Sequence, residues 1–537
     1  MNRQQTFSMP SSAAVVDRFS RAFARRCAID LRALAVFRML LGALLIVDLL
    51  GRSRSLVAFY TDAGVLPRRA LFSDYSNVYS LHAISGEAWV QVLLFLVAGV
   101  FAGAVLVGYR TRLSMIVSWL LSLSLHARNP IVLNAGDEFL IRLCFWAIFL
   151  PLGERWAIDA RGSDRERSTV ASIATLAILL QVLVMYVTNA VHKSQSEMWM
   201  RGDAVAYVMQ ADQLTVLLGN VLASYPALLE WVTVLWVALL FSSPLLFLLT
   251  GLRRAVFVTL FVGMHLGMAV TMQLILFPFA SVAGLLLFYP PLVWDGAVDL
   301  AQRIDVGPIS RFRPASIDDA LEALPSPARV RAAFAAVVPS GTNVTAAVSS
   351  GSNAEIVQRA SNAFARGWRT LLTVLPYLFL VFAVLSSVAS VGVASVPAPV
   401  ERTLDRTQME QNWEMFAPVP THTTRWYTAP GQLENGTIVD VFHESERSSD
   451  RPPKVENTYP TGRWRKYLNN VRFADNTNHR SYAANYLCER WNRRHDTPVE
   501  RLKLIGYDET VDPYEGTSET NEHVLVEYEC DGPFVQS

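Results

Sequence analysis

Long apolar segments are the feature that most limits how this chain can fold. A helix of about 20 apolar residues crosses the roughly 30 Å hydrocarbon core of a bilayer. Segments of this kind recur at 31–50, 88–109, 112–127, 136–152, 169–191, 225–249, 255–273, 273–290 and 368–395. The sequence therefore predicts an all-α polytopic membrane bundle of about nine transmembrane helices, with the lipid bilayer as its solvent.

The composition supports a membrane protein and excludes a nucleic-acid-binding one. Apolar residues make up 52% of the chain and charged residues 17%, against about 25% charged in soluble domains. The formal net charge is +1, and no block of Lys or Arg forms the basic stripe typical of nucleic-acid binding. We therefore expect no nucleic-acid partner.

The first apolar segment is predicted to be an uncleaved span. A signal peptide would need a cleavage site where Asp48, Arg52 and Arg54 stand. Basic residues flank a membrane span mainly on its cytoplasmic side, and four arginines lie close before this segment: Arg18, Arg21, Arg25 and Arg26. This places the N-terminus in the cytoplasm.

Nine spans then place the C-terminus outside the cytoplasm. Most short loops agree, because three arginine groups fall on the predicted inner side: Arg110 and Arg112, then Arg161, Arg165 and Arg167, then Arg253 and Arg254. The first outer loop disagrees, since it also carries arginines: Arg52, Arg54, Arg68 and Arg69. The predicted localisation is multi-pass, in a bacterial inner membrane.

The predicted organisation has five parts. A cytoplasmic segment (1–30) precedes the bundle (31–295), and a partly flexible cytoplasmic loop (296–367), rich in Ala, Ser and Arg, follows it. The last transmembrane helix (368–396) leads to a small extracytoplasmic α+β domain (397–537). In that domain, RWYTAP and IVDVFH are predicted strands on either side of an Asn435-Gly436 turn, with a helix near 478–493 and strands near 501–507 and 523–530.

Four cysteines test this topology. Cys27 falls in the predicted cytoplasm and Cys144 inside a span, whereas Cys488 and Cys530 share the outer domain. Only Cys488 and Cys530 are therefore candidates for a disulfide. The alternative is two unrelated free thiols.

Polar residues beside the spans suggest a site, because charge buried in hydrocarbon needs a partner or a cavity. The first cluster is ARNPIVLNAGDEFLIRL and the histidine before it, which supplies His126, Arg128, Asn129, Asn134, Asp137 and Glu138. A structural interpretation stands beside the functional one. Asn134 or Asp137 would cap the fourth helix, and Glu138 has the i,i+4 spacing of an ion pair with Arg142.

The second cluster, NAVHKSQSEMWMRG, places His192 and Lys193 at the end of the fifth span, on the same predicted outer face. A lysine at this position commonly extends to the lipid headgroups. Under a lid, desolvation would instead favour its neutral amine, which can act as a base.

The third feature is His265, about ten residues into the seventh span. An imidazole at that depth is hydrogen-bonded or faces a cavity, and a packing histidine is the ordinary case. A haem would need a second axial ligand on a neighbouring helix, and no other histidine is predicted at that depth. No metal site is predicted.

The order of RMLLGALLIVDLL, ARNPIVLNAGDEFLIRL, FLPLGERWAIDA, VHKSQSEMWMRGDAVAY and the His265 segment resembles the horizontally transferred transmembrane (HTTM) domain family. This family is related to vitamin K-dependent gamma-carboxylase. The resemblance covers about 31–295, and NWEMFAPVP looks like the segment that follows the bundle in bacterial relatives.

The resemblance implies an extracytoplasmic active site in which a lysine deprotonates a reduced, vitamin K-like quinone. Oxygenation of that quinone then generates a base strong enough for carboxylation. Lys193 best matches this lysine, although its spacing to Trp199 differs by about one residue from the carboxylase pattern. His126-Ala127-Arg128 stand where the carboxylase has an aromatic residue, and the chain is too short for the carboxylase's full lumenal portion.

The predicted topology puts Lys193, the Asn129–Glu138 loop and the C-terminal domain on one side, an arrangement that would let a lid cover a membrane-interface pocket. Four residues are candidates for seating it, or else are ordinary core and turn residues: Trp413, Phe416, Pro418 and Pro420. Two function classes follow. One is a quinone- or lipid-dependent oxidoreductase or carboxylase-like enzyme; the other is a non-catalytic scaffold or transporter. No protein partner can be named.

Overall fold

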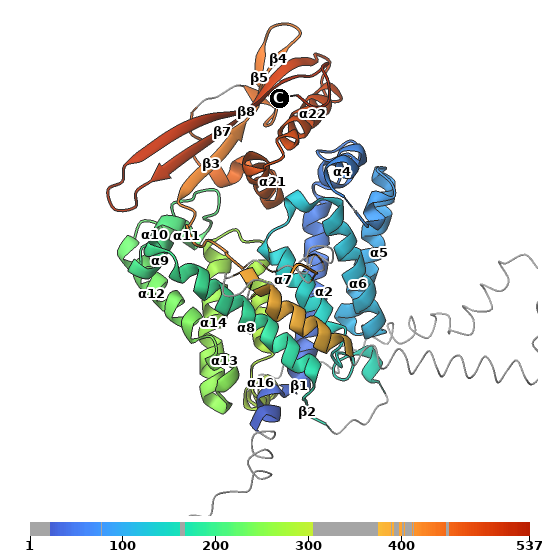
Figure 1. Cartoon of the computed structure of the whole chain (residues 1–537), viewed down its shortest axis with the longest axis vertical. Helices are drawn as coiled ribbons and strands as arrows, with labels where there is room; N and C mark the ends of the chain where they lie inside the picture. Colours follow the sequence, from blue (N-terminus) through green and yellow to red (C-terminus); the bar gives the residue numbers. More distant parts are fainter. Residues whose placement is uncertain are drawn as a thin grey trace, which may run out of the picture. The chain divides into compact units, whose positions relative to one another are not determined.

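A computed structural model describes residues 22–76, 78–161, 167–303, 374–387, 389–390, 397–399, 402, 411, 413–446 and 450–536. The chain divides into two compact units, residues 1–290 with 380–537 and residues 291–379. In the first unit, a β-sheet domain covers one end of a helical bundle (Figure 1). The N-terminal segment up to residue 21 and most of the loop predicted at 296–367, from residue 304 onward, lie outside the described residues.

The described part of the bundle is built from helices of very different length. The longer ones are α2 (Leu31–Ser53), α5 (Ala88–Val107), α6 (Thr111–Arg128), α7 (Ala135–Ala147), α8 (Ile173–Ser194), α12 (Pro226–Ser242), α14 (Gly251–Thr271) and α15 (Phe277–Leu286). Short helices lie in the connections between them: α3 (Leu56–Tyr60), α4 (Arg68–Asp74), η1 (Leu81–Ala83), η2 (Pro130–Val132), η3 (Ile158–Ala160), α9 (Glu197–Arg201), α10 (Ala204–Val208), α11 (Leu218–Leu222) and α13 (Leu245–Leu248). Helix α16 (Pro291–Arg303) belongs to the second unit.

Local sequence fixes where several helices begin. Ser172 and Thr175 form a capping box at the start of α8, and Asn134 and Asp137 form one at the start of α7. The predicted span at 169–191 therefore starts later, because Thr169–Val170 form strand β2, which pairs with β1 (Ile29–Asp30). This short pairing is absent from the sequence prediction.

Four helices are long and apolar enough to cross a membrane, or up to five if α15 and α16 form one broken span. The four are α2, α5, α8 and α14. The prediction of nine such helices is therefore not confirmed in the described part of the chain. Helix α6 contains four serines as well as His126 and Arg128, α7 has 13 residues, α15 has 10, and Pro244 separates α12 from α13.

Exposed apolar side chains identify the lipid-facing surfaces. On α5, they recur at helical spacing as a stripe of Trp89, Leu93, Leu96 and Val100. The opposite face of α5 buries small residues such as Ala98 and Ala102 against the bundle. An exposed apolar stripe of this kind is stable in lipid but not in water.

The C-terminal domain is an antiparallel sheet with two helices. Its strands are β3 (Thr423–Thr428), β4 (Pro430–Leu433), β5 (Ile438–Asp440), β6 (Ser445–Glu446), β7 (Val499–Val511) and β8 (Ser518–Glu529). The order is β3-β7-β4-β5-β6, with β8 also paired to β7. The helices are α21 (Gly462–Phe473) and α22 (Asn478–Asn492), and η5 (Val455–Thr458) precedes them. The turn at Asn435-Gly436 joins β4 to β5. The strand predicted at RWYTAP, residues 425–430, is divided between the end of β3 and the start of β4.

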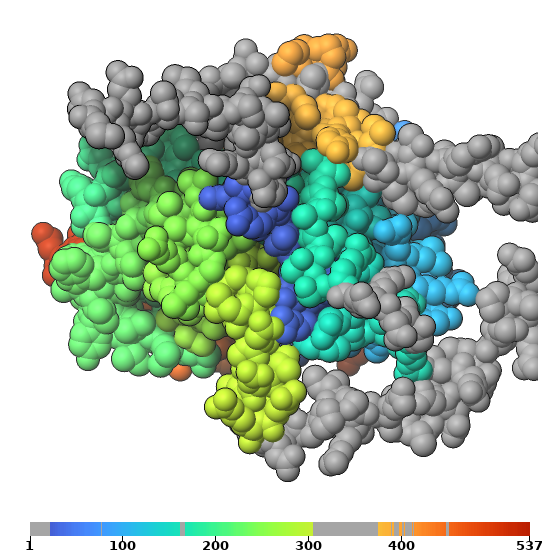
Figure 2. Space-filling view, turned by 90° about the horizontal axis from the view of Figure 1, so that it is seen from below, coloured from blue at the N-terminus to red at the C-terminus, as the bar shows by residue number. Residues whose placement is uncertain are grey.

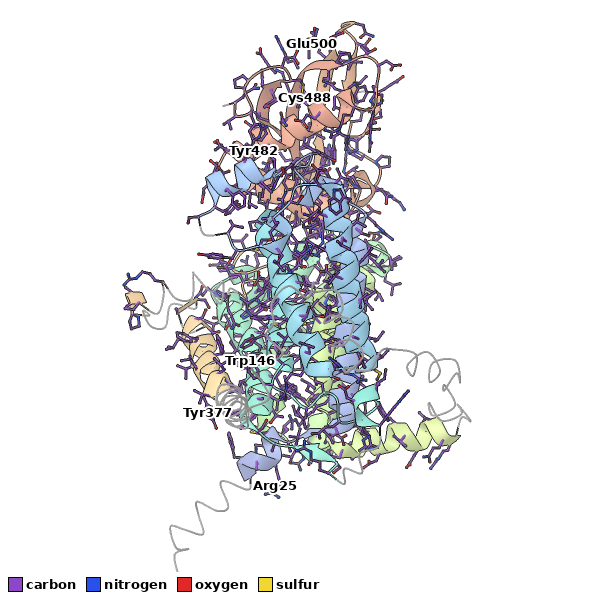
Figure 3. All side chains as sticks on the ribbon, turned by 90° about the vertical axis from the view of Figure 1, so that its right-hand side faces the viewer. Arg25, Trp146, Tyr377, Tyr482, Cys488 and Glu500 are labelled. Carbon is purple, nitrogen blue, oxygen red and sulfur yellow. A yellow bond between two sulfur atoms is a disulfide. The ribbon has the colours of Figure 1, made fainter. Side chains whose placement is uncertain are left out.

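The bundle end opposite the sheet is rich in arginine. Arg26 donates to the Leu248 carbonyl, and Arg254 donates to the Arg26 carbonyl. Figure 2 shows this end, where the first described residues lie between the α13–α14 region and the segment around residues 150–175. In Figure 3, Arg25 lies at this end, Trp146 lies within the bundle, and Cys488 lies in the C-terminal domain.

Candidate functional site

The end of α8 next to the C-terminal domain carries a buried lysine. Lys193 lies in the last turn of α8, where the helix dipole favours positive charge. Its side chain is buried, with Nζ 3.5 Å from the centre of the Trp199 indole ring on α9. It therefore does not extend to headgroups, as an ordinary terminal lysine would.

A strap of residues 413–418 lies against α8 and α9. Four consecutive carbonyls of the strap accept hydrogen bonds from three side chains of these helices. Asn189 donates to Trp413 O at 2.9 Å and Glu414 O at 2.8 Å, Lys193 donates to Met415 O at 2.9 Å, and Trp199 donates to Phe416 O at 2.8 Å. The backbone of the strap is thereby fixed, even though Met415 and Phe416 adopt positive φ angles of 36° and 64°.

A buried amide network holds the start of the strap. Gln181 of α8 donates to Gln411 at 2.8 Å, and the Trp413 indole donates to Gln411 at 3.0 Å. Trp413 is itself buried and packs edge-on against Phe139. Trp413, one of the four residues considered for seating a lid, is therefore a core residue that packs the strap against the bundle.

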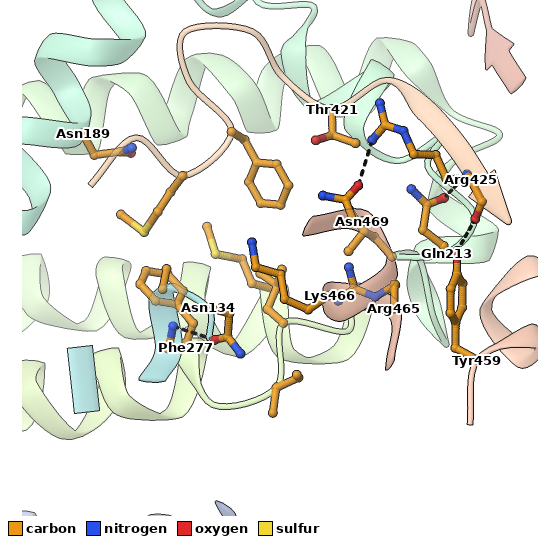
Figure 4. Close-up of a pocket in the computed structure, with 18 of the residues that line it drawn as sticks. Asn134, Asn189, Gln213, Phe277, Thr421, Arg425, Tyr459, Arg465, Lys466 and Asn469 are labelled. Atoms are coloured by element: carbon orange, nitrogen blue, oxygen red, sulfur yellow. Dashed lines mark hydrogen bonds between the residues drawn. The ribbon is translucent and has the colours of Figure 1, made fainter. Parts of the chain in front are cut away.

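A cavity of about 260 Å³ lies between the strap, the bundle and the C-terminal domain (Figure 4). Lys193, Asn189 and Tyr186 line it from α8, and Met415 and Phe416 line it from the strap. The other lining residues are Asn134, Ala135, Gly136, Gln213, Leu214, Trp236, Met268, Leu274, Ile275, Phe277, Thr421, Arg425, Tyr427, Tyr459, Arg465, Lys466 and Asn469. The lining combines apolar side chains from the bundle with polar and basic ones from the C-terminal domain, which suits an amphipathic ligand.

A tyrosine–histidine pair forms part of the cavity wall. Tyr186 lines the cavity, and its hydroxyl lies 2.8 Å from His265 Nε2 on α14. Both side chains are buried, and the His265 ring also contacts Trp236 and Phe277. His265 is therefore a hydrogen-bonded histidine behind the cavity wall, the ordinary interpretation for this position, and it orients Tyr186.

Asp137 lies in a buried ion cluster outside the cavity. It accepts hydrogen bonds from Arg52 at 2.6 Å and from Arg463 at 2.8 Å. Arg463 also binds Asp48, and Arg52 lies 3.4 Å from His126 Nε2. Because Arg463 comes from α21 while the other members come from α2, α6 and α7, this cluster anchors the C-terminal domain to the bundle.

The other predicted site residues have structural contacts. Arg128 donates to the carbonyls of Leu66 and Thr61. Asn129 donates to the Phe59 carbonyl and accepts from Ile131 N. Glu138 pairs with Arg142, as the i,i+4 spacing indicates. His192 is buried beside Lys193, does not line the cavity, and its Nε2 has no hydrogen-bond partner among the described residues. Asn134 both caps α7 and lines the cavity.

Sequence reasoning missed the part of the cavity that the C-terminal domain provides. Arg465, Lys466 and Asn469 lie on α21, and Arg425 lies on β3. A signal was present in Gly462-Arg463-Trp464-Arg465-Lys466, where basic residues follow the N-cap residue Thr461 and alternate with a core tryptophan. In the described part of the chain, no group of three His, Cys, Asp or Glu residues could hold a metal ion.

Comparison with known proteins gives the family. The family model described as the HTTM domain matches residues 27–294, which contain the described bundle, Lys193 and Asn189. Neither a curated protein nor a solved structure matches the chain. The chain belongs to the HTTM domain family and is a membrane protein of that family.

Proposed function

We propose that the cavity binds a hydrophobic hydroxylated molecule, a reduced quinone or a lipid, and that Lys193 is the base that removes its hydroxyl proton. The observation that supports this proposal is the environment of Lys193. It is buried at the cavity wall, and its contacts are a carbonyl and an indole ring. Among the described residues, the structure records no carboxylate partner for it.

The cavity is suited to an aromatic ring with a hydroxyl group. Trp236, Phe277 and Phe416 supply flat apolar surface, and Lys193 and Asn189 supply polar contacts on the α8 side. A bound quinol would supply the oxygen-reactive ring for an oxidoreductase or carboxylase-like reaction. In the proposed proton transfer, the O–H bond breaks, the proton goes to the lone pair of Nζ, and the negative charge stays on the ligand oxygen.

The strap has a defined part in this proposal. It covers Lys193 and excludes water from the amine, because its carbonyls from Trp413 to Phe416 are all held by α8 and α9 side chains. Exclusion of water strengthens every electrostatic interaction within the site. His192 is proposed to act as a neighbour that shapes the burial of Lys193.

We also propose the finer topology, with nine spans, a cytoplasmic N-terminus and an extracytoplasmic C-terminal domain in a bacterial inner membrane. On this topology, the cavity opens on the outer side. The alternating directions of the described helices and the arginine-rich end opposite the sheet support it.

The test is oxygen uptake by the purified full chain with short-chain benzoquinols and naphthoquinols. Lys193→Arg keeps a donor for the Met415 carbonyl and a cation to stack on Trp199, but a guanidinium cannot be deprotonated. We expect the rate to fall by about 100-fold or more, the usual contribution of a general base. Thermal stability should be nearly unchanged.

The matched control is Ser194→Ala, at the next position, where the exposed hydroxyl donates only to the Val191 carbonyl. Its rate should equal that of the wild type. Equal oxygen uptake by wild type and Lys193→Arg would rule out Lys193 as the base. A wild type that consumes no oxygen with any of these quinols would favour the non-catalytic scaffold, in which Lys193 serves to anchor the strap.

A further inference from the structure

The C-terminal domain supplies basic residues to one side of the cavity. Helix α21 packs Trp464, Tyr467 and Leu468 into the domain core. Arg465 and Lys466 therefore fall on a different face of the helix, together with Asn469. Figure 4 shows Lys466 extending from α21 into the cavity, and Asn469 hydrogen-bonded to Arg425.

These basic residues are not equally neutralised. Arg425 forms an ion pair with Asp508 at 3.1 Å. Arg465 donates one hydrogen bond to the Gln273 carbonyl at 3.0 Å, and its buried Nε has no partner. Lys466 has no hydrogen-bond or ion-pair partner among the described residues.

Nothing acidic balances these charges from within the cavity. The lining residues include Lys193, Arg465 and Lys466, and none of those that the structure describes is Asp or Glu. Burial, and next the positive charge of Arg465, lower the pKa of the Lys466 amine. Burial lowers the pKa of Arg465 to about 10. Each shift reflects a cation that is destabilised in the free protein and that an added anion would stabilise.

The opposite side of the same cavity is apolar. Trp236, Met268 and Phe277 come from α12, α14 and α15, inside the bundle. A ligand that satisfies both sides must carry an anionic group next to an apolar body. A small free anion would satisfy the cations but leave the apolar side unfilled.

We propose that Arg465 and Lys466 form an anion-binding subsite for the phosphate or carboxylate of an amphiphile, whose apolar part lies against Trp236, Met268 and Phe277. This inference rests on the proposed function only for the location of the ligand, since it concerns binding and not the proton transfer. It narrows the ligand class from any hydroxylated hydrophobic molecule to an anionic one.

The test is isothermal titration of the purified full chain, in neutral detergent, with octyl phosphate, 1-octanol and inorganic phosphate. We expect saturable binding of octyl phosphate, with a Kd at least about tenfold lower than that of either of the other two probes. Lys466→Gln should raise the Kd of octyl phosphate by about tenfold or more, because it removes a charged hydrogen-bond donor. Lys466 has no hydrogen-bond or ion-pair partner among the described residues, so we expect this variant to fold normally.

Lys503→Gln is the matched control. Lys503 is an exposed lysine of the same domain, pairs with Glu527 and lies outside the cavity lining. It should leave the Kd unchanged, and Arg465→Gln should act like Lys466→Gln. If inorganic phosphate binds as tightly as octyl phosphate, the apolar part of the ligand does not contribute to binding, and the proposal of an amphiphilic ligand is wrong. If 1-octanol binds as tightly as octyl phosphate, the proposal of an anion subsite is wrong. The same holds if Lys466→Gln and Lys503→Gln change the Kd of octyl phosphate equally.

The two proposals fail in different ways. If Lys193 is not the base, Lys193→Arg keeps its oxygen uptake and the Lys466→Gln binding defect is unaffected. If the anion subsite is wrong, octyl phosphate does not bind preferentially, whereas the loss of uptake in Lys193→Arg remains.

Discussion

Asp137 accepts hydrogen bonds from two buried arginines, Arg52 of α2 in the bundle and Arg463 of α21 in the C-terminal domain. The three side chains are almost entirely buried. A buried ion pair contributes little net stability, but removing one partner leaves an uncompensated charge. Asp137 thus has a different role from the half-exposed Glu138 beside it, which pairs with Arg142 of the same helix.

Asp137→Asn should therefore destabilise the folded protein by about 3–5 kcal/mol. The substitution leaves Arg52 and Arg463 buried with Asp48 as their remaining carboxylate. Glu138→Gln is the control and should cost about 1 kcal/mol or less. Equilibrium unfolding in mixed micelles measures both, and similar losses for the two variants would show that the cluster does not hold the domain.

Sequence reasoning identified the local contacts of this region but not the distant ones. The capping box of Asn134 with Asp137 and the pair of Glu138 with Arg142 follow from spacings of three and four residues. The contact of Asp137 with Arg463 joins residues 326 positions apart. No periodicity within one helix specifies such a partner, so the sequence leaves both a functional site and a structural role open for this cluster.

At the scale of elements, α2 and α5 approach closely at Gly42. A Cβ built on Gly42 would lie 2.6 Å from the Leu106 backbone nitrogen. Small residues at such crossings allow helices in lipid to pack backbone to backbone. Gly103 of α5, by contrast, has nothing within 4 Å of an added Cβ.

Gly42→Ala should destabilise the bundle by about 1–3 kcal/mol, because the added methyl group forces the two helices apart. Gly103→Ala should be neutral or slightly stabilising, since alanine favours a helix by up to about 1 kcal/mol over glycine. Thermal unfolding in detergent compares the two. A Gly42→Ala variant as stable as Gly103→Ala would mean that α2 and α5 move apart without cost.

The pairing of Cys488 with Cys530 connects α22 to the residue after β8. The structure joins them in a disulfide with a Cα–Cα distance of 5.7 Å. The alternative of two free thiols is tested by non-reducing peptide mapping of protein from an oxidising compartment, where we expect the linked peptide. If both cysteine-containing peptides are recovered unlinked, the two thiols are free and the disulfide is not formed.

Closing a loop of 42 residues contributes about 4 kcal/mol in the chain-entropy model. Cys488→Ser with Cys530→Ser should therefore lower the free energy of unfolding of the C-terminal domain by roughly that amount. Cys144→Ser is the control, because that buried cysteine is free. Its effect should be confined to the bundle.

At the scale of the whole molecule, the sequence predicted a helical membrane protein with a C-terminal domain containing strands, and the structure has both. Apolar length and turn chemistry determine these features locally. The cavity was less predictable, because its lining residues come from α8, the strap and α21, which lie far apart in the sequence. Lys193 and Asn134 were identified, whereas Arg465 and Lys466 belong to an element that has no membrane signal.

Three of the four arginines that contradicted the predicted topology have structural partners. Arg52 is in the buried cluster, Arg68 pairs with Asp62, and Arg69 lies 3.7 Å from the centre of the Phe534 ring in the C-terminal domain. Paired arginines of this kind have a folding role that does not depend on the side of the membrane. The arginines at the opposite end are of both kinds: Arg26 and Arg254 donate to backbone carbonyls, whereas Arg32 pairs with Asp30 and Arg167 with Glu154.

The proposed topology, with a cytoplasmic N-terminus, predicts that an enzyme fused after residue 400 is active only if it works outside the cytoplasm. Alkaline phosphatase fused there should be active, and a reporter that works only in the cytoplasm should be inactive. Fusions after residue 110, next to Arg110 at the arginine-rich end, should give the reverse pattern because that loop is predicted inside. Cytoplasmic reporter activity after residue 400 would place the sheet domain, the strap and the Lys193 cavity inside the cell. The proposed extracytoplasmic position of the cavity would then be wrong, although the contacts that build the cavity would be unchanged.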